Sequence, residues 1–451
     1  MNTDEAILDL GIGNNNESMA NKPEDAVIIE NTGEIADDTI KTEKLWSRNF
    51  FLLWQGQLVS VFGDAVYALA LGFWVMAKTG STALMGTLMA ASTLPSVLIS
   101  PFAGVIVDRV DRKKLMIATD AIRGLAVALL AFAAYRDALQ IWMVFAAGII
   151  LSVGGAFFSP AVGSATPDLV PQSKLVSANS VMGMLNTGSN IVGSSAGGFL
   201  LQVLGAPFLF LFNGLSFIVS SILTIFIKIP KIEKKTEQHF MADMRDGYKF
   251  IWHFKALRYL LFIAAGINFL FSIAMVLYLP LFQRTQSLGA GKYGIAMAFM
   301  TGGMFISMAI TSMLKIPSGK RMTIFITASF LMAGFFTAFG ITEVFVVMAA
   351  FMFGGGFCLA IVNVFVYSTV QLTVPQEIRG KVFALITTVC MSLTPFAMAI
   401  GGALGEVFPL RHVIVTCCAI MFVGFIPCIF IKPLKRFVNF DPEKETLEDI
   451  M

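Results

Sequence analysis

The sequence predicts an all-α integral membrane protein in which twelve membrane-spanning helices form two pseudo-symmetric bundles of six. Composition is the first reason. Of the 451 residues, 56% are hydrophobic and 14% are charged, whereas soluble domains carry about 25% charged residues. The mean hydropathy is +0.77, so the chain has more apolar surface than a water-soluble fold could bury. The other two reasons are a series of long apolar segments and an internal repeat.

Twelve apolar segments are long enough to cross a bilayer, which takes about 20 residues in a helix. They cover residues 49–77, 83–107, 115–135, 140–163, 176–204, 207–227, 258–282, 293–314, 322–341, 343–370, 382–406 and 411–431. Connections are short except for the lysine-rich stretch 228–257, which separates six segments from six. We therefore expect bundles at 49–227 and 258–432, joined by a linker at 228–257.

Two short sequence motifs of the first half recur in the second half at the same offset of 204 residues. The tripeptide Val170–Gln172 returns as Val374–Gln376, and the pair Gly197–Gly198 returns as Gly401–Gly402. In each half, the tripeptide precedes the fifth span and the glycine pair lies within it. A shared offset predicts parallel repeats related by an axis along the membrane normal, with a substrate site near the midplane between them.

Both ends of the chain are polar, and the basic residues predict the orientation. Residues 1–48 hold 11 acidic and four basic residues and lack the features of a signal peptide, so we expect a disordered acidic tail. Residues 433–451 form a shorter tail. With both tails in the cytoplasm, cytoplasmic segments carry 26 Lys and Arg and outer loops carry five, as the positive-inside rule requires.

Several kinds of chemistry find no support in the sequence. The five cysteines lie in apolar segments without metal-ligand or disulfide spacing. A phosphate-binding loop of the Gly-x4-Gly-Lys-[Ser/Thr] type is missing, and Ser, His and acidic residues do not converge as a nucleophilic set would. We therefore expect no enzyme, no metal, no bound cofactor and no nucleic-acid partner.

Asp64 is a carboxylate in the middle of an expected span, the first. An ionised Asp there costs about 2.5–3.5 kcal/mol on insertion scales, so it faces a polar cavity, has a partner or is protonated. Gln57 and Ser60 share its helix face at i, i+3, i+7 spacing. Two hypotheses follow: a site for a proton or a cationic substrate, or an Asp that fixes helix packing.

Asp120 and Arg123 lie in the cytoplasmic half of the third expected span. Their i, i+3 spacing lets them pair on one helix face. One hypothesis is a buried structural pair near the cytoplasmic gate. The other is that Arg123 is a partner for Asp64 or for an anionic substrate.

The connection between the second and third spans combines Gly104, Asp108 and the basic residues Arg109, Arg112 and Lys113. Membrane anchoring explains the basic residues but not a glycine four positions before an aspartate. The pattern resembles the corresponding loop of the major facilitator superfamily, Gly-x-x-x-Asp-Arg-x-x-Arg-Lys.

By that resemblance, the loop is a cytoplasmic gate that braces one bundle against the other when the transporter is open outward. Its expected counterparts are Asp168, at the end of the fourth span, and the start of the eleventh helix near Arg379–Lys381. The matching loop of the second half, Lys315–Arg321, has no acid, so we expect an asymmetric gate. The alternative is that these residues only anchor the helices.

The fifth span carries four glycines, Gly188, Gly193, Gly197 and Gly198. Their spacing resembles the antiporter motif of proton-coupled drug exporters, with Ser194 in the place of its proline. Close-packed helix faces are a common use of such glycines.

Longer stretches resemble the macrolide-efflux and enterobactin-exporter branch of the superfamily. They include Arg48–Gln57, Ala165–Pro171, Asn213–Phe217 and Val374–Val382, and the resemblance covers residues 48–432. It implies a secondary active exporter of a bacterial inner membrane that moves an amphipathic small molecule outward in exchange for protons. We expect a monomer in the lipid bilayer, powered by the proton gradient. The alternatives are a lysolipid or metabolite transporter of the same fold and, more remotely, a non-transporting membrane sensor.

Overall fold

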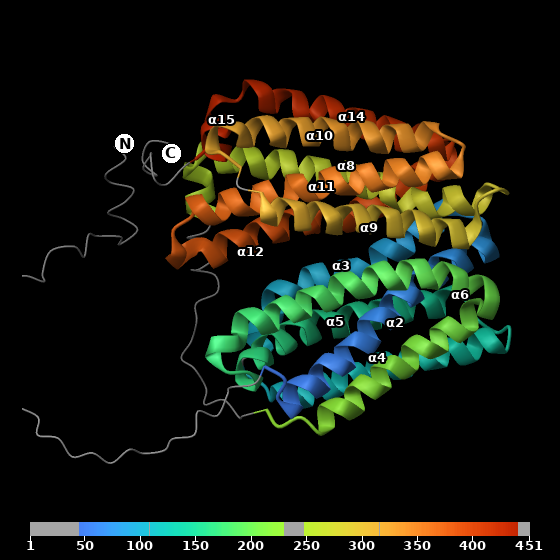
Figure 1. Cartoon of the computed structure of the whole chain (residues 1–451). Helices are drawn as coiled ribbons and strands as arrows, with labels where there is room; N and C mark the ends of the chain where they lie inside the picture. The colour runs from blue at the N-terminus through green and yellow to red at the C-terminus, as the bar shows by residue number, and fades with distance from the viewer. Residues whose placement is uncertain (1–44, 108, 230–247, 315, 441–451) are drawn as a thin grey trace, which may run out of the picture. The chain divides into compact units, whose positions relative to one another are not determined.

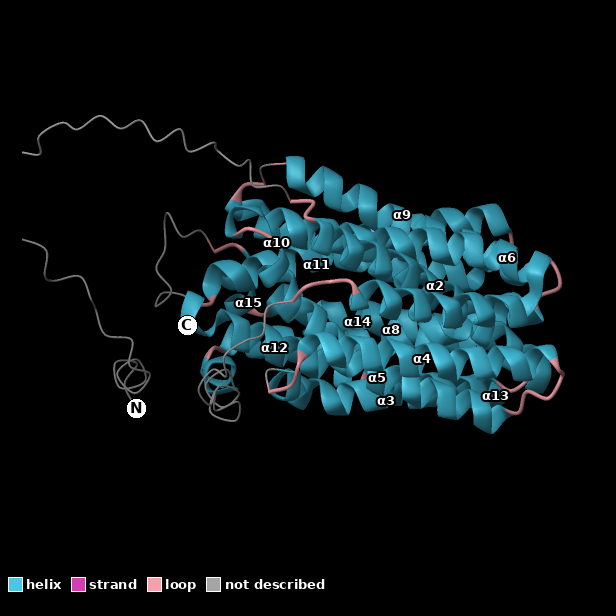
Figure 2. Ribbon diagram, turned by 90° about the horizontal axis from the view of Figure 1, so that it is seen from below, coloured by secondary structure: helices cyan, strands magenta, loops and turns pink. Residues whose placement is uncertain are grey.

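The computed structural model describes residues 45–107, 109–229, 248–314 and 316–440, all within one compact unit of the chain. Most of both predicted tails, most of the predicted linker, and Asp108 lie outside the described residues. The structured part consists of helices running side by side, as the two perpendicular views show (Figures 1 and 2). In Figure 1 they form two groups, one made of α2 to α6 and the other of α8 to α15.

The first bundle contains five continuous helical elements. They are α2 (Arg48–Thr79), α3 (Thr82–Val107), α4 (Arg112–Tyr135), α5 (Ile141–Leu169) and α6 (Leu175–Ile225). Within α6 the backbone of Gly205 is not helical, with φ 76° and ψ 167°, a conformation that glycine adopts readily. Helix α6 bends back on itself (Figure 1), and the kink at Gly205 divides it into the fifth and sixth spans.

The second bundle repeats the pattern with one further interruption. Its helices are α8 (Lys255–Arg284), α9 (Gly289–Met313), α10 (Ser318–Ile341), α11 (Phe345–Thr373), α12 (Gln376–Ser392), α13 (Thr394–Val407), α14 (Leu410–Phe430) and α15 (Lys432–Val438). Helices α12 and α13 meet at Leu393, just before Pro395, and together form one span. In the described residues, eleven helical stretches are long and apolar enough to cross a membrane. With the reversal at Gly205, they make the twelve predicted spans, which confirms the fold class.

Local sequence explains several helix ends. Ser47 caps α2 because its Oγ accepts a hydrogen bond from the Phe50 amide at 3.1 Å, and Asp111 caps α4 through the Lys114 amide at 3.1 Å. Such caps satisfy amides that have no partner inside the helix. Gly80 ends α2 in the left-handed conformation, with φ 66°.

The end of the helices at which the described chain begins and stops is called the terminal end, and the opposite end is called the distal end. The Asn49 side chain donates a hydrogen bond to the Lys228 carbonyl at 3.4 Å, and Arg321 donates one to the Phe440 carbonyl at 2.8 Å. Both limits of the described chain therefore lie at the terminal end. The turn between α2 and α3 and the bend within α6 lie at the distal end (Figure 1).

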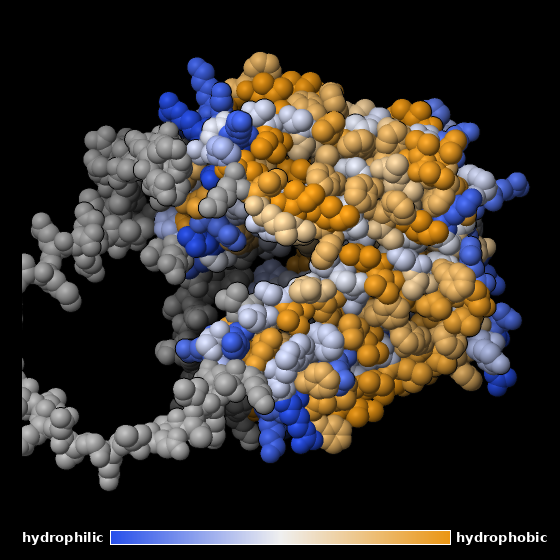
Figure 3. All heavy atoms as spheres, in the orientation of Figure 1, coloured by the Kyte–Doolittle hydropathy of each residue, from blue (hydrophilic) through white to orange (hydrophobic). Residues whose placement is uncertain are grey.

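The outer surface between these ends is apolar (Figure 3). Large side chains such as Phe132 and Phe262, each 61% exposed, point away from the bundles. This is the expected arrangement for helices that face lipid.

Two described segments outside the predicted spans belong to the folded unit. Residues 248–253 are helical, and helix α15 follows α14 directly. The rings of Phe254 and Phe437 meet edge to face with centroids 5.2 Å apart, and both are fully buried. Residues 248–254 and α15 therefore pack beside the second bundle, whereas Lys228, at the start of the predicted linker, is hydrogen-bonded to Asn49 of the first bundle.

Candidate functional site

Asp64 contacts a polar group on the sixth span. Asn213 Nδ2 donates a hydrogen bond to Asp64 Oδ1 at 3.3 Å, and Ser216 Oγ donates to Asn213 Oδ1 at 3.1 Å. Gly63 makes this approach possible, because a Cβ there would lie 2.6 Å from both Asn213 Oδ1 and Ser216 Oγ. Asn213 is fully buried, whereas Asp64 is half-buried.

Asp120 and Arg123 form a buried ion pair on α4. Arg123 Nη2 lies 2.8 Å from Asp120 Oδ1, and the side chains are 7% and 0% exposed. The guanidinium also lies over two rings, with its carbon 4.0 Å from the Phe217 centroid and 4.9 Å from the Phe158 centroid. Cation–π contacts of this kind stabilise a desolvated cation. Asp120 Oδ2 and Arg123 Nε have no hydrogen-bond partner within the described part of the chain.

These two groups form one polar cluster inside the first bundle. Arg123 is close enough to Asp64 to interact with it electrostatically. Asn213 and Phe217, which contact Asp64 and Arg123 respectively, are one turn apart on the sixth span. The cluster therefore pairs one guanidinium with Asp120 at 2.8 Å and brings it within electrostatic range of Asp64. Because a guanidinium stays protonated, it can balance only one of the two carboxylates.

Gln57 and Ser60 lie closer to the terminal end on α2. Ser60 is 3% exposed, and its hydroxyl donates to the Gln57 carbonyl at 3.4 Å. Gln57 itself is half-buried.

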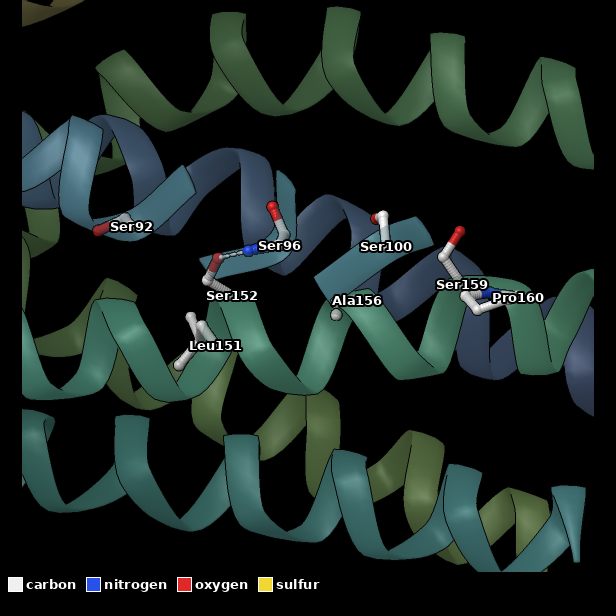
Figure 4. Close-up of a pocket in the computed structure, with 9 residues that line it drawn as sticks. Ser92, Ser96, Ser100, Leu151, Ser152, Ala156, Ser159 and Pro160 are labelled. Atoms are coloured by element: carbon white, nitrogen blue, oxygen red, sulfur yellow. Dashed lines mark hydrogen bonds between the residues drawn. The ribbon is translucent and has the colours of Figure 1, made fainter. Parts of the chain in front are cut away.

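A cavity of about 520 Å³ lies between α3 and α5. Five hydroxyls line it, and no charged side chain does; its walls are Ser92, Ser96, Ser100, Leu151, Ser152, Gly155, Ala156, Ser159 and Pro160. The hydroxyls of Ser96, Ser100 and Ser159 point to the same side (Figure 4). Arg123 lies behind the wall, since its Nη1 is 3.8 Å from where a Cβ on Gly155 would be. The cavity thus offers neutral donors and acceptors backed by a cation.

The predicted gate residues make contacts at the terminal end of the first bundle. Arg112 Nη1 forms an ion pair with Asp168 Oδ2 at 3.1 Å and bonds the Ser164 carbonyl at 2.9 Å. Lys113 Nζ bonds the Ile225 carbonyl, at the end of α6, at 2.7 Å. Arg109 is exposed. These contacts join α4 to α5 and α6, and the proposed role of Asp108 lies outside the described residues.

At this end two gate glycines have no close neighbour among the described residues. A Cβ on Gly104 or on Gly380, the expected counterparts, would meet no atom within 4 Å. Figure 3 shows a hollow between the two groups of helices on this side.

At the distal end the bundles are in contact. A Cβ on Gly402 would lie 2.5 Å from the Thr82 carbonyl oxygen and 2.8 Å from Gly86 Cα. A Cβ on Gly198 would overlap the backbone of Ala290. Gly402 lies 204 residues after Gly198, and Ala290 lies 204 residues after Gly86, so the two crossings are related by the predicted repeat.

The glycines of the fifth span have different surroundings. Gly193 and Gly197 pack against α2, at Ala65 and Val66, and Gly198 packs against α9. A Cβ on Gly188 would meet no atom within 4 Å. The motif is therefore a packing surface along part of its length.

Solved structures of transporters share this fold. The nucleoside transporter NupG is 12% identical and superposes with a TM-score of 0.67, over 85% of this chain and 99% of that one. A bacterial homologue of the iron transporter ferroportin, in an inward-facing state, is 16% identical with a TM-score of 0.65, over 84% and 98%. At these identities the likeness concerns the fold alone.

Sequence comparison makes the assignment more specific. The chain belongs to the transmembrane secretion effector family of major facilitator transporters, whose sequence model matches residues 44–445. It is 26% identical to macrolide efflux protein A of Streptococcus pyogenes over 409 residues, which are 87% of this chain and 98% of the relative. The putative bacilysin exporter BacE of Bacillus subtilis is 28% identical over 294 residues, 64% and 72% of the two chains. The predicted resemblance to macrolide-efflux proteins is confirmed, and the chain is not an enzyme.

Proposed function

We propose that this transporter exports an amphipathic small molecule in exchange for protons by alternating access. The export direction is supported by relatives named for macrolide efflux and bacilysin export. The single observation that carries proton exchange is the cluster of Asp64, Asp120 and Arg123, in which one cation faces two carboxylates. Ionising both acids leaves one buried negative charge without a partner, which is costly in a bilayer.

The cluster takes up its proton at Asp64 in this scheme. Asp120 keeps its 2.8 Å ion pair with Arg123, so the proton belongs on the other, half-buried carboxylate. Protonation from outside favours the return to the inward-facing state, and proton release inside accompanies substrate export. No bound cofactor is involved, since the proton gradient supplies the energy.

The serine-lined cavity between α3 and α5 is proposed to hold a neutral, hydroxyl-bearing part of the substrate. Serine hydroxyls both donate and accept, which suits a ligand that carries hydroxyl groups. A drug, a macrolide-like compound or a siderophore-like compound fits this description.

We place the chain as a monomer in a bacterial inner membrane with both termini in the cytoplasm. Basic side chains such as Arg112, Lys113 and Arg321 make contacts at the terminal end, which the positive-inside rule assigns to the cytoplasm. With distal contacts made and no atom within 4 Å of a Cβ on Gly104 or Gly380, we assign the conformation as inward-facing.

A toxicity screen in a drug-sensitive bacterial host tests the proposal. Cells expressing the wild type should survive macrolides or other amphipathic drugs at higher concentrations than cells expressing Asp64→Asn at the same level. Equal protection by both proteins would contradict the role of Asp64. Protection against no compound, together with altered uptake of lysolipids or metabolites, would favour the alternative transporter.

A further inference from the structure

The turn between α2 and α3, residues 80–83, is held at the distal end by a carboxylate of the other bundle. Glu406, on α13, accepts four hydrogen bonds through its Oε2 atom. Two come from Thr82, from the amide at 2.8 Å and from the hydroxyl at 2.9 Å. The others come from Ser81 Oγ at 3.2 Å and the Ala83 amide at 3.3 Å. The carboxylate therefore caps the first turn of α3 from across the interface.

A cation of the second bundle holds the other side of the same turn. Arg284, at the end of α8, donates from Nη2 to the Gly80 carbonyl at 2.6 Å, which follows the last residue of α2. The N-terminus of a helix favours an anion and the C-terminus favours a cation. Glu406 and Arg284 thus place each charge where the helix end attracts it.

The helix backbones pack tightly around these contacts. Gly86 and Gly402 lie so close that a Cβ on either would overlap the other helix, and Thr82 is completely buried. A separation of α3 from α13 therefore breaks the hydrogen bonds of Glu406, because a contact lengthened to about 3.6 Å is no longer a hydrogen bond.

The internal repeat supplies a neutral version of the same contact. The position 204 residues before Glu406 is Gln202. Its side-chain amide lies against Gly289 and Gly291, at the start of α9, the counterpart of α3. At the crossing with α3 the helix N-terminus therefore meets a carboxylate, and at the crossing with α9 it meets a neutral amide.

We propose that Glu406 and Arg284 form a charged clamp on the turn at residues 80–83, which stabilises the state closed at the distal end. Opening that end for substrate release breaks the clamp, so the two residues set the balance between the two states. This proposal rests on the alternating access proposed above. It assigns a conformational role to two residues that the sequence does not single out.

Distances between spin labels in lipid nanodiscs test the clamp without a known substrate. Labels at Ala138→Cys and Gln286→Cys report the distal end, and labels at Lys114→Cys and Lys320→Cys report the terminal end; all four positions are exposed. The five native cysteines are buried or half-buried, and labelling of the unmodified protein measures their background.

The key variant is Glu406→Gln, which replaces the charged group by the one found at the related position. We expect the ratio of distally closed to distally open molecules to fall about tenfold, as loss of charge-assisted hydrogen bonds predicts. Thr82→Val, which removes one donor, should shift the ratio in the same direction by less. Arg284→Gln, measured with the spin-label pair at the terminal end, should increase the fraction of molecules in which the terminal end is closed. Glu343→Gln, an exposed acid at the same end, is the matched control and should change nothing.

Two outcomes separate the clamp from the proposed mechanism. If the wild type populates both states across external pH and Glu406→Gln leaves their ratio unchanged, the clamp is wrong. If no condition produces a distally open state in any variant, alternating access itself fails. Unfolding temperatures of all variants show whether each is folded; if Glu406→Gln is not, Thr82→Val decides the first question.

Discussion

Arg123 forms its 2.8 Å ion pair with Asp120 on its own helix, while Asp64 accepts a longer, 3.3 Å hydrogen bond from Asn213. One cation thus pairs closely with one carboxylate and lies near a second. In the proposed mechanism, Asp120 stays paired with Arg123 and Asp64 is the acid that exchanges a proton. This unequal arrangement is the basis of the first prediction.

Replacing Asp120 should destabilise the protein, because Arg123 cannot lose its proton. Asp120→Asn leaves a buried cation without its close partner, and breaking such a pair costs about 3–5 kcal/mol. Unfolding in denaturant, followed in detergent, measures the change. Asp137→Asn is the control, since this exposed residue already has a left-handed backbone with φ 52°, which Asn tolerates. A loss for Asp120→Asn no larger than that of the control would contradict the pairing.

The glycine crossing at the distal end should not accept a methyl group. In Gly402→Ala, the new Cβ would lie 2.5 Å from the Thr82 carbonyl oxygen, and such overpacking typically costs about 1–3 kcal/mol. Unfolding temperature and transport rate should both fall. Gly424→Ala adds the same methyl group on α14, outside the gate, where no atom lies within 4 Å, so it should keep both. Similar behaviour of the two variants would rule out the tight crossing.

Hydroxyls of the serine-lined cavity should contribute to substrate affinity. Ser159→Ala removes a hydroxyl that lines the cavity, and a lost hydrogen bond of about 1 kcal/mol corresponds to a rise in KM of about fivefold. Initial rates of transport at varied substrate concentration separate KM from the maximal rate, which should be unchanged. Ser307→Ala, at a fully buried hydroxyl of the second bundle, is the control. An unchanged KM in Ser159→Ala would exclude this hydroxyl from the substrate site.

Labelling of intact cells tests the orientation. A membrane-impermeant maleimide should react with Ala138→Cys, at the distal end, before the cells are permeabilised. It should react with Lys320→Cys, at the terminal end, only afterwards, because the basic terminal end is assigned to the cytoplasm. The reverse order would place the termini outside.

Hydropathy and repeats predicted the fold because lipid imposes long apolar helices and the repeat imposes their pairing. The spacing of Asp120 and Arg123 also predicted their ion pair. The hydrogen-bond partner of Asp64 was harder to predict, because Asn213 lies 149 residues away in the chain. Pairing over that separation depends on tertiary packing. Gly63 was the local signal that another helix comes close at this point.

The distal contacts of Glu406 and Arg284 had no signal strong enough to be recognised in the sequence. Each residue ends an apolar segment, where a charged side chain is ordinary. Their partners are backbone groups and two hydroxyls of the turn at residues 80–83, which no sequence pattern marks. The offset of 204 residues, which relates Gly402 to Gly198, was the available pointer to this interface.

Proton coupling through Asp64 is tested most directly in proteoliposomes with an imposed pH gradient. Substrate identified in the toxicity screen is followed together with proton flux, for the wild type and for Asp64→Asn. The wild type should concentrate substrate against its gradient when the pH gradient is present. Asp64→Asn should still equilibrate substrate but should neither concentrate it nor move protons with it. Concentrative transport by Asp64→Asn at the wild-type rate would contradict the proposed mechanism.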